Sequence, residues 1–192
     1  MAPRIIIFNN SLDDLVDIKQ CLSKSSYKLV SVCHSLTEMS QAVITNDINL
    51  VMVVTDKKFD PLFATVRQIN KQHPIPFIIF TYEDNRCVIE SAIKAGVSAY
   101  IVDGLQANRV ISILDTAHLL FNEQQRVKTE LEKTKTTLAE RKLIDKAKGI
   151  LMQRSAQDED SIYKSMRKAA MDKNIKIAEL AKSIIDSHEL MT

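Results

Sequence analysis

Basic side chains gather in one stretch of this 192-residue sequence. Residues 126–154 hold nine Lys and Arg against four Asp and Glu, whereas residues 1–125 hold 11 against 13. A local excess of positive charge of this kind can attract a polyanion such as a nucleic acid. The same pattern is also typical of a solvated helix face, so charge alone leaves both interpretations open.

Side chains that could catalyse a reaction or bind a metal are sparse and scattered. The four histidines stand too far apart to predict a metal site, and the three cysteines form no Cys-x-x-Cys pair. The chain has only three glycines, and they form no glycine-rich phosphate loop. We therefore expect a protein that is not an enzyme and that binds no metal or cofactor.

The cysteines and the apolar runs also bear on location. Three scattered cysteines favour a reducing compartment, so a cytoplasmic protein is expected. No apolar run reaches the roughly 18 residues that cross a bilayer, so no association with a membrane is expected.

The first hundred residues alternate strand and helix patterns. The apolar runs that predict strands are residues 5–8, 29–32, 50–54, 77–80 and 99–102. Alternation of five strands with helices predicts an α/β fold, in which helices cover both faces of a parallel sheet. At this length the flavodoxin-like strand order 2-1-3-4-5 is the first choice, and we assign this domain to residues 1–106.

The residues that follow these strands decide what chemistry the sheet can perform, because an open parallel sheet places its chemistry at the carboxyl ends of its strands. The positions there are Asn9 and Asn10, Val54 to Asp56, Thr81, and Asp103. Most of these groups are neutral, and no arrangement of nucleophile and base is evident.

A coiled-coil pattern follows the α/β segment. No Gly or Pro occurs between Gly104 and Gly149. Alternating spacings of four and three residues link Ile113, Ala117, Leu120, Gln124, Val127, Leu131, Thr134 and Leu138. This pattern predicts a coiled-coil helix over residues 107–136 that pairs two copies of the chain, with the six apolar positions as the dimer seam. The alternative is one amphipathic helix that lies on its own domain.

The remaining segment, residues 137–192, shows three further helix patterns. Their apolar residues fall within 138–153, 162–170 and 177–185. Three short helices in fewer than sixty residues bury only a small core. We therefore expect this domain to depend on the coiled coil or on a second copy for stability.

The α/β segment resembles a response-regulator receiver. Receivers carry an acidic pair for Mg²⁺, a phosphoacceptor Asp, a Thr or Ser, and a Lys at the strand ends. The matching residues here are Asn9, Asn10, Val54, Thr81 and Asp103. Two amides and a valine cannot build the oxygen cage that Mg²⁺ requires, and valine cannot accept a phosphoryl group. The resemblance implies a pseudo-receiver that is not controlled by phosphorylation, with Asp56 as the alternative acceptor.

The last segment resembles the ANTAR domain of transcription antiterminators. The resemblance rests on residues 141–152, which include Ala-Lys-Gly-Ile-Leu-Met, and on residues 166–172 and 178–181. The stretch 96–105 is similar to the nitrate-assimilation branch of that family, and the amidase regulators are more distant. The family binds paired hairpin loops in leader mRNA, which implies that this domain binds RNA and allows transcription to continue past a terminator.

The resemblance and the charges together give the candidates for RNA contact. They are Arg141, Lys142, Lys146, Lys148, Gln153, Arg154, Arg167, Lys168, Lys173 and Asn174. Spacing places Lys142 and Lys146 on one helix face, and it predicts the same for Arg167 and Asn174. Aromatic residues are scarce in this part of the chain, so reading by charged and amide side chains is favoured over stacking on aromatic rings.

Two positions of the C-terminal segment are assigned to helix packing, and one connection and one further position differ from the family pattern. Ala147 and Gly149 are expected to allow close packing of helices. The connection at residues 155–160 lacks the family's usual Gly, and Ser161 stands where a small apolar residue is common. These differences bear on the geometry between helices.

The resemblance also implies partners. A coiled-coil homodimer would present two RNA-binding domains to two hairpins. Regulators of the nitrate branch are held inactive by a nitrate-sensing protein that resembles a periplasmic binding protein, and control by such a partner is expected here. The alternatives are a DNA-binding response regulator with a helical output domain and a signalling adaptor that binds no nucleic acid.

Overall fold

The computed structural model describes residues 2–11, 15–56, 59–102, 104–155 and 158–190. The chain divides into two compact units, residues 1–125 and residues 126–192. Each unit has a hydrophobic core of its own side chains.

The first unit is built on a five-stranded sheet. The strands are β1 (Arg4–Asn10), β2 (Lys28–Cys33), β3 (Leu50–Thr55), β4 (Phe77–Phe80) and β5 (Ala99–Ile101). They lie in the order β2-β1-β3-β4-β5, and every neighbouring pair is parallel. The predicted strand order and the flavodoxin-like fold are therefore confirmed.

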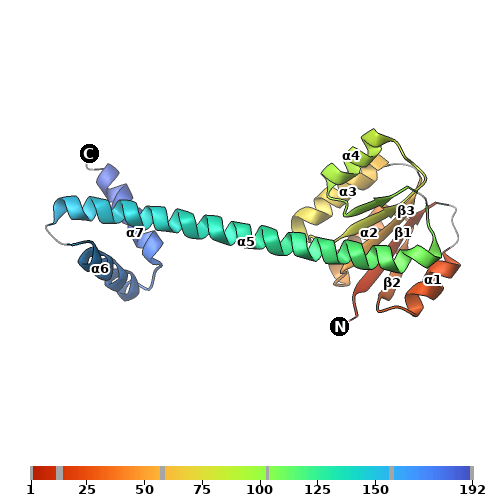
Figure 1. Ribbon diagram of the computed structural model, residues 1–192, viewed down its shortest axis with the longest axis horizontal. Helices are drawn as coiled ribbons and strands as arrows, with labels where there is room; N and C mark the ends of the chain where they lie inside the picture. The colour runs from red at the N-terminus through yellow and green to blue at the C-terminus, as the bar shows by residue number, and fades with distance from the viewer. Residues whose placement is uncertain (1, 12–14, 57–58, 103, 156–157, 191–192) are drawn as a thin grey trace. The chain divides into compact units, whose positions relative to one another are not determined.

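Helices cover both faces of this sheet (Figure 1). They are α1 (Val16–Ser23), α2 (Leu36–Thr45), α3 (Phe59–Gln72), α4 (Arg86–Ala95) and the beginning of α5 (Ala107–Arg154). Helices α2, α3 and α4 pack on the face that holds Ile6 and Val51, whereas α1 and α5 pack on the face that holds Ile5 and Met52. Because the strands are covered on both faces, their apolar residues form continuous runs.

Helix α5 runs without interruption through residue 136, where a boundary between coiled coil and C-terminal domain is predicted. Its first turns belong to the α/β core, in which Val110 and Ala117 are buried. The continuity agrees with the absence of Gly and Pro from most of its length, since these residues have the lowest helix propensities.

The second unit contains three helical segments. They are the C-terminal part of α5, α6 (Glu159–Asp172) and α7 (Ile177–Glu189). The core between them consists of Ala147, Ile150, Ile162, Met166, Ala170, Leu180, Ala181 and Ile185. The three predicted helix patterns are present. None of the helices in the described ranges combines the length and the apolar character that a bilayer crossing requires.

Candidate nucleic-acid interface

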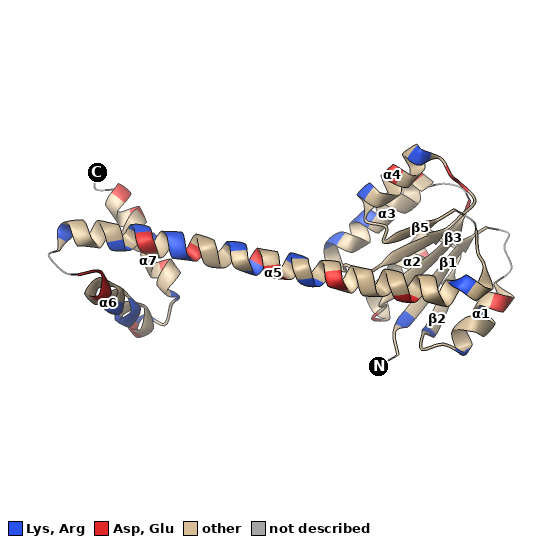
Figure 2. Cartoon of the chain, in the orientation of Figure 1, with Lys and Arg blue, Asp and Glu red and all other residues tan. Residues whose placement is uncertain are grey.

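Exposed basic side chains stand on α5 and α6 around the small core of the second unit (Figure 2). Arg141 and Lys142 on α5 and Arg167 and Lys168 on α6 are all exposed. None of these four side chains has an ion-pair partner among the residues that the structure describes. No described carboxylate lies within ion-pair distance of these four cations, so they are open to phosphates.

Lys148 differs from these four because it is bonded inside the domain. Only 16% of its side chain is exposed, and its Nζ lies 2.7 Å from Asp145 Oδ1 and 2.6 Å from Glu159 Oε1. The hydrogen bonds to Asp145 and then Glu159 raise the pKa of Lys148, and the bond from Lys148 lowers the pKa of Asp145. Lys148 thus links α5 to α6, and any phosphate would compete with two carboxylates for it.

Two further candidates on α5 contact α7. Lys146 Nζ donates a hydrogen bond to Glu189 Oε1 at 2.8 Å, and this bond lowers the pKa of Glu189. An Arg154 guanidinium nitrogen lies 3.4 Å from His188 Nδ1. Lys146 and Arg154 are exposed, as is the neighbouring Gln153, so these contacts lie at the surface of the unit.

Asn174 lies just beyond the end of α6, where its backbone caps the helix. Helix α6 ends at Asp172, and Asn174 adopts a left-handed conformation with a φ of 51°. Its N–H donates to Met171 O at 3.0 Å, which closes the helix. The prediction that Arg167 and Asn174 share a helix face is wrong, because the helix does not extend that far. Lys173, the C-cap residue, is exposed.

Gly149 lies on the outside of α5, contrary to the prediction that it allows close packing. No atom of a neighbouring residue lies within 4 Å of the position that a Cβ would occupy, whereas Ala147 is fully buried. The assignment of Ala147 to helix packing therefore holds and that of Gly149 is wrong.

The described residues that match a receiver's phosphorylation site do not form such a site in the structure. Val54 is 1% exposed and belongs to the core. The strand register places Asn9 beside Val54 and Asn10 beside Thr55. Asp103 lies outside the described residues. Within the described ranges, no group of three His, Cys, Asp or Glu could hold a metal ion.

Asp56 takes part in a hydrogen-bonded network that the sequence did not predict. Its Oδ1 accepts a bond from the Thr81 hydroxyl at 3.4 Å and another from the backbone N–H of Tyr82 at 3.1 Å. Asp56 thereby joins the end of β3 to the end of β4. The only sequence signal for this contact was that Asp56 and Thr81 both follow neighbouring strands.

The predicted dimer seam divides into two parts. Ala117 is buried in the α/β core and Ile113 packs against that core. The remaining apolar seam residues are half exposed, at 50–57%. They are Leu120, Val127, Leu131 and Leu138. The first part thus follows the alternative interpretation, a helix lying on its own domain, and only the second part is open to another helix.

The structure thus combines a receiver-like α/β domain with a helical domain that carries exposed basic side chains. The helical domain is an ANTAR domain, since the ANTAR domain family model matches residues 132–185. Among solved structures, a signal receiver domain from Pseudomonas fluorescens has a TM-score of 0.55 and 18% identity, and the match covers 64% of this chain and 99% of that one. The likeness confirms the receiver-like fold.

Curated relatives are also regulators. The transcriptional regulatory protein PdtaR of Mycobacterium tuberculosis is 22% identical over 96% of this chain and 90% of its own length. A nitrate regulatory protein of Klebsiella oxytoca is 39% identical over 33% of this chain and 16% of its own length. The aliphatic amidase regulator of Pseudomonas aeruginosa is 26% identical over 53% of this chain and 52% of its own length. The predicted resemblance to the nitrate and amidase regulators is confirmed.

Proposed function

We propose that this protein is a cytoplasmic RNA-binding regulator of transcription antitermination, without enzymatic activity, that binds paired hairpin loops in leader mRNA. The observation that carries the proposal is the ANTAR domain at residues 132–185, together with exposed basic side chains that form no ion pair with the described residues of that domain. Control of nitrate or nitrite assimilation genes is the proposed role, supported by the similarity to a nitrate regulatory protein.

The unpaired cations give the proposed interface its physical basis. Arg141 and Lys142 lie next to each other on α5, and Arg167 and Lys168 do so on α6. Arg and Lys side chains release counterions when they neutralise phosphates, so binding should weaken as salt rises. Arg and the amide of Gln153 can also hydrogen-bond to the edges of unpaired bases in a loop.

A homodimer through α5 is the second part of the proposal. Leu120, Val127, Leu131 and Leu138 recur at heptad spacing and are half exposed in the single chain. Pairing with a second copy would remove this apolar surface from water. Two linked ANTAR domains would then bind two hairpins with a gain in affinity from effective concentration.

Control by a sensor protein, and not by phosphorylation, completes the proposal. Val54 has no group that can accept a phosphoryl group, and the neighbouring Asp56 is bonded to Thr81 and Tyr82. A protein that binds this chain and hides the ANTAR domain is the proposed form of control. Incubation with acetyl phosphate should leave no acid-labile phosphate on the protein, and recovery of such a phosphate on Asp56 would refute this part.

Gel shifts with the full chain test the proposed function. The probes are a two-hairpin leader RNA recovered with the protein from its own cells, the same RNA with altered loops, and a duplex DNA of equal length. We expect a shift with the first probe at concentrations that leave the other two unbound. Preference for the duplex would favour a DNA-binding regulator, and failure to bind any probe would favour an adaptor.

A further inference from the structure

The amino-terminal edge of the sheet carries a hollow with basic side chains in its wall. It has a volume of about 480 Å³, and its lining includes Arg4, Lys28 and His118. Arg4 and Lys28 come from the first residues of β1 and β2, and His118 comes from α5. The backbone of Arg4 is held by Asn49, because Arg4 N donates to Asn49 Oδ1 at 2.8 Å and Asn49 N donates to Arg4 O at 2.9 Å.

Two polar atoms of this wall are buried without a partner. Among the described residues, the buried side-chain nitrogen and oxygen atoms that lack a hydrogen bond are Arg4 Nε and His118 Nδ1. Both belong to side chains that line the same hollow. Buried polar groups of native proteins normally have a hydrogen-bond partner, so these two nitrogens single out the wall of this hollow.

The charges of the wall are also unbalanced. Arg4 and Lys28 are register partners on adjacent strands, and like charges placed side by side repel each other. Neither forms an ion pair with a described residue. The acid in the wall is Asp47, which has a left-handed conformation with a φ of 49° and is not paired with either cation. Two fixed cations against one carboxylate leave a net positive site.

We propose that this hollow binds a small organic anion whose phosphate or carboxylate group lies between Arg4 and Lys28. An oxyanion there would neutralise the repulsion between the two cations and accept hydrogen bonds from the Arg4 guanidinium.

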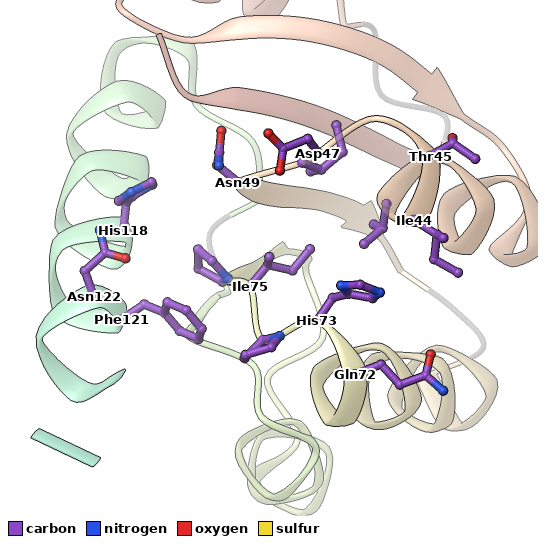
Figure 3. Close-up of a pocket in the computed structure, with 14 residues that line it drawn as sticks. Ile44, Thr45, Asp47, Asn49, Gln72, His73, Ile75, His118, Phe121 and Asn122 are labelled. Atoms are coloured by element: carbon purple, nitrogen blue, oxygen red, sulfur yellow. The ribbon is translucent and has the colours of Figure 1, made fainter. Parts of the chain in front are cut away.

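A second hollow offers room for the body of such a ligand. Its volume is about 530 Å³, and it shares Asp47, Asn49 and His118 with the first. Figure 3 shows His118 and Phe121 on α5 across from Asn49 and Ile75. Phe121 and Ile75 supply apolar surface beside these polar groups, which suits a ligand with a ring or short apolar body.

An NMR titration of the full chain tests the proposal. The probes are inorganic phosphate, acetate and phenyl phosphate, with ionic strength held constant by sodium chloride. We expect saturable changes at the backbone amides of Arg4, Asn49 and His118 with at least one oxyanion. Phosphate and acetate separate the two possible charged groups, and phenyl phosphate should bind more tightly than phosphate if the second hollow takes the body of the ligand. Equal affinities would refute the role of the second hollow.

Four variants sharpen this test. Arg4→Gln should weaken binding at least about tenfold, because it removes the charged hydrogen bonds. Asp47→Asn should strengthen binding roughly twofold to fivefold, because it removes a repulsive charge while Asn tolerates the left-handed backbone. Lys19→Gln, an exposed position on α1, should leave binding unchanged. Lys28→Gln, at the exposed rim, replaces Arg4→Gln if that variant fails to fold.

Some outcomes would overturn the proposal. Amide signal changes that do not saturate, or that chloride alone reproduces, would show that no oxyanion binds near Arg4 Nε and His118 Nδ1. Equal losses in Arg4→Gln and Lys19→Gln would indicate general charge attraction. Phosphate-induced changes that occur only in the amide signals of residues 126–192 would show that phosphate binds the ANTAR domain. That result would refute this site, while it would leave the proposed function intact.

Discussion

The carboxyl edge of the sheet and the surface of the helical unit differ in how far their side chains bond to one another. At the carboxyl edge of the sheet, Thr81 and Tyr82 both donate hydrogen bonds to Asp56, and apolar residues such as Val54 are buried. In the helical unit, the exposed cation Lys142 has no ion-pair partner among the described residues, and the apolar Leu131 is half exposed. The unsatisfied groups are where a second molecule can bind, so the comparison separates scaffold from interface.

The same distinction divides the basic residues themselves. Lys148 has two carboxylate partners and little exposure, whereas the exposed Lys142 has no ion-pair partner in the described chain. Equal formal charges therefore serve different purposes: Lys148 joins α5 to α6, and Lys142 is open to a phosphate. Four experiments test these two distinctions, beginning with the one of largest expected effect.

Leu131→Asp should disrupt the proposed dimer most strongly. Burial of a leucine contributes about 1.5–3 kcal/mol, and the substitution acts in both copies, so the dissociation constant should rise at least about a hundredfold. Sedimentation velocity over a concentration series measures this constant. Lys133→Asp lies on the same helix outside the seam and is the matched control. A dimer that tolerates Leu131→Asp would show that the seam is not the interface.

Arg141→Ala combined with Lys142→Ala should weaken RNA binding roughly tenfold at moderate salt. Loss of two phosphate contacts should also reduce the salt slope of the affinity by about 2. Fluorescence anisotropy at several salt concentrations measures both quantities. The double variant Lys19→Ala with Lys94→Ala removes equal charge from the α/β unit. If the two double variants behave alike, the reading of Arg141 and Lys142 as contact residues is incorrect.

Lys148→Met should destabilise the helical unit by roughly 1–2 kcal/mol, because it removes charged hydrogen bonds and leaves Asp145 and Glu159 facing each other. Urea unfolding followed by circular dichroism measures this change. Lys142→Met should stay within about 0.5 kcal/mol of the wild type, since it removes an exposed cation without an ion-pair partner in the described chain. Equal stability of the two variants would contradict the division of the cations.

The smallest expected effect is the change in the free energy of unfolding when the pH is lowered. The folded pKa of Asp145 lies below its ordinary value, mainly because of the bond from Lys148. A lowered folded pKa stabilises the fold above the unfolded value, about 4, and this contribution disappears as pH falls through the folded pKa. Urea unfolding at pH 6 and pH 3 should show a smaller acid loss in Lys148→Met than in the wild type. An equal loss of stability in the two proteins would mean that the bond between Lys148 and Asp145 does not contribute to the free energy of unfolding.

Most of the fold could be predicted because its signals are local. Continuous apolar runs mark strands that are buried on both faces, and their alternation with helices gives the parallel order. The boundary at residue 136 could not be placed, because nothing in the sequence interrupts α5. Heptad spacing alone also could not show that Ala117 packs on its own sheet while Leu131 remains exposed.

The candidate interface was less predictable, because it depends on contacts between helices. Lys148 is paired through Glu159, which lies on another helix. Asn174 closes α6 because the chain turns there, and Gly149 faces open space although its type suggested close packing. In each case residue type and spacing placed the side chain near the right surface, and only the tertiary contacts decided its role.

The central claim is that the ANTAR domain recognises hairpin loops and not polyanions in general. The most direct test is the ratio of two dissociation constants of the full chain at one salt concentration, for the recovered two-hairpin RNA and for the same RNA with scrambled loops. We expect the scrambled loops to bind at least about tenfold more weakly, as the loss of one good base contact would require. Equal dissociation constants would contradict the account.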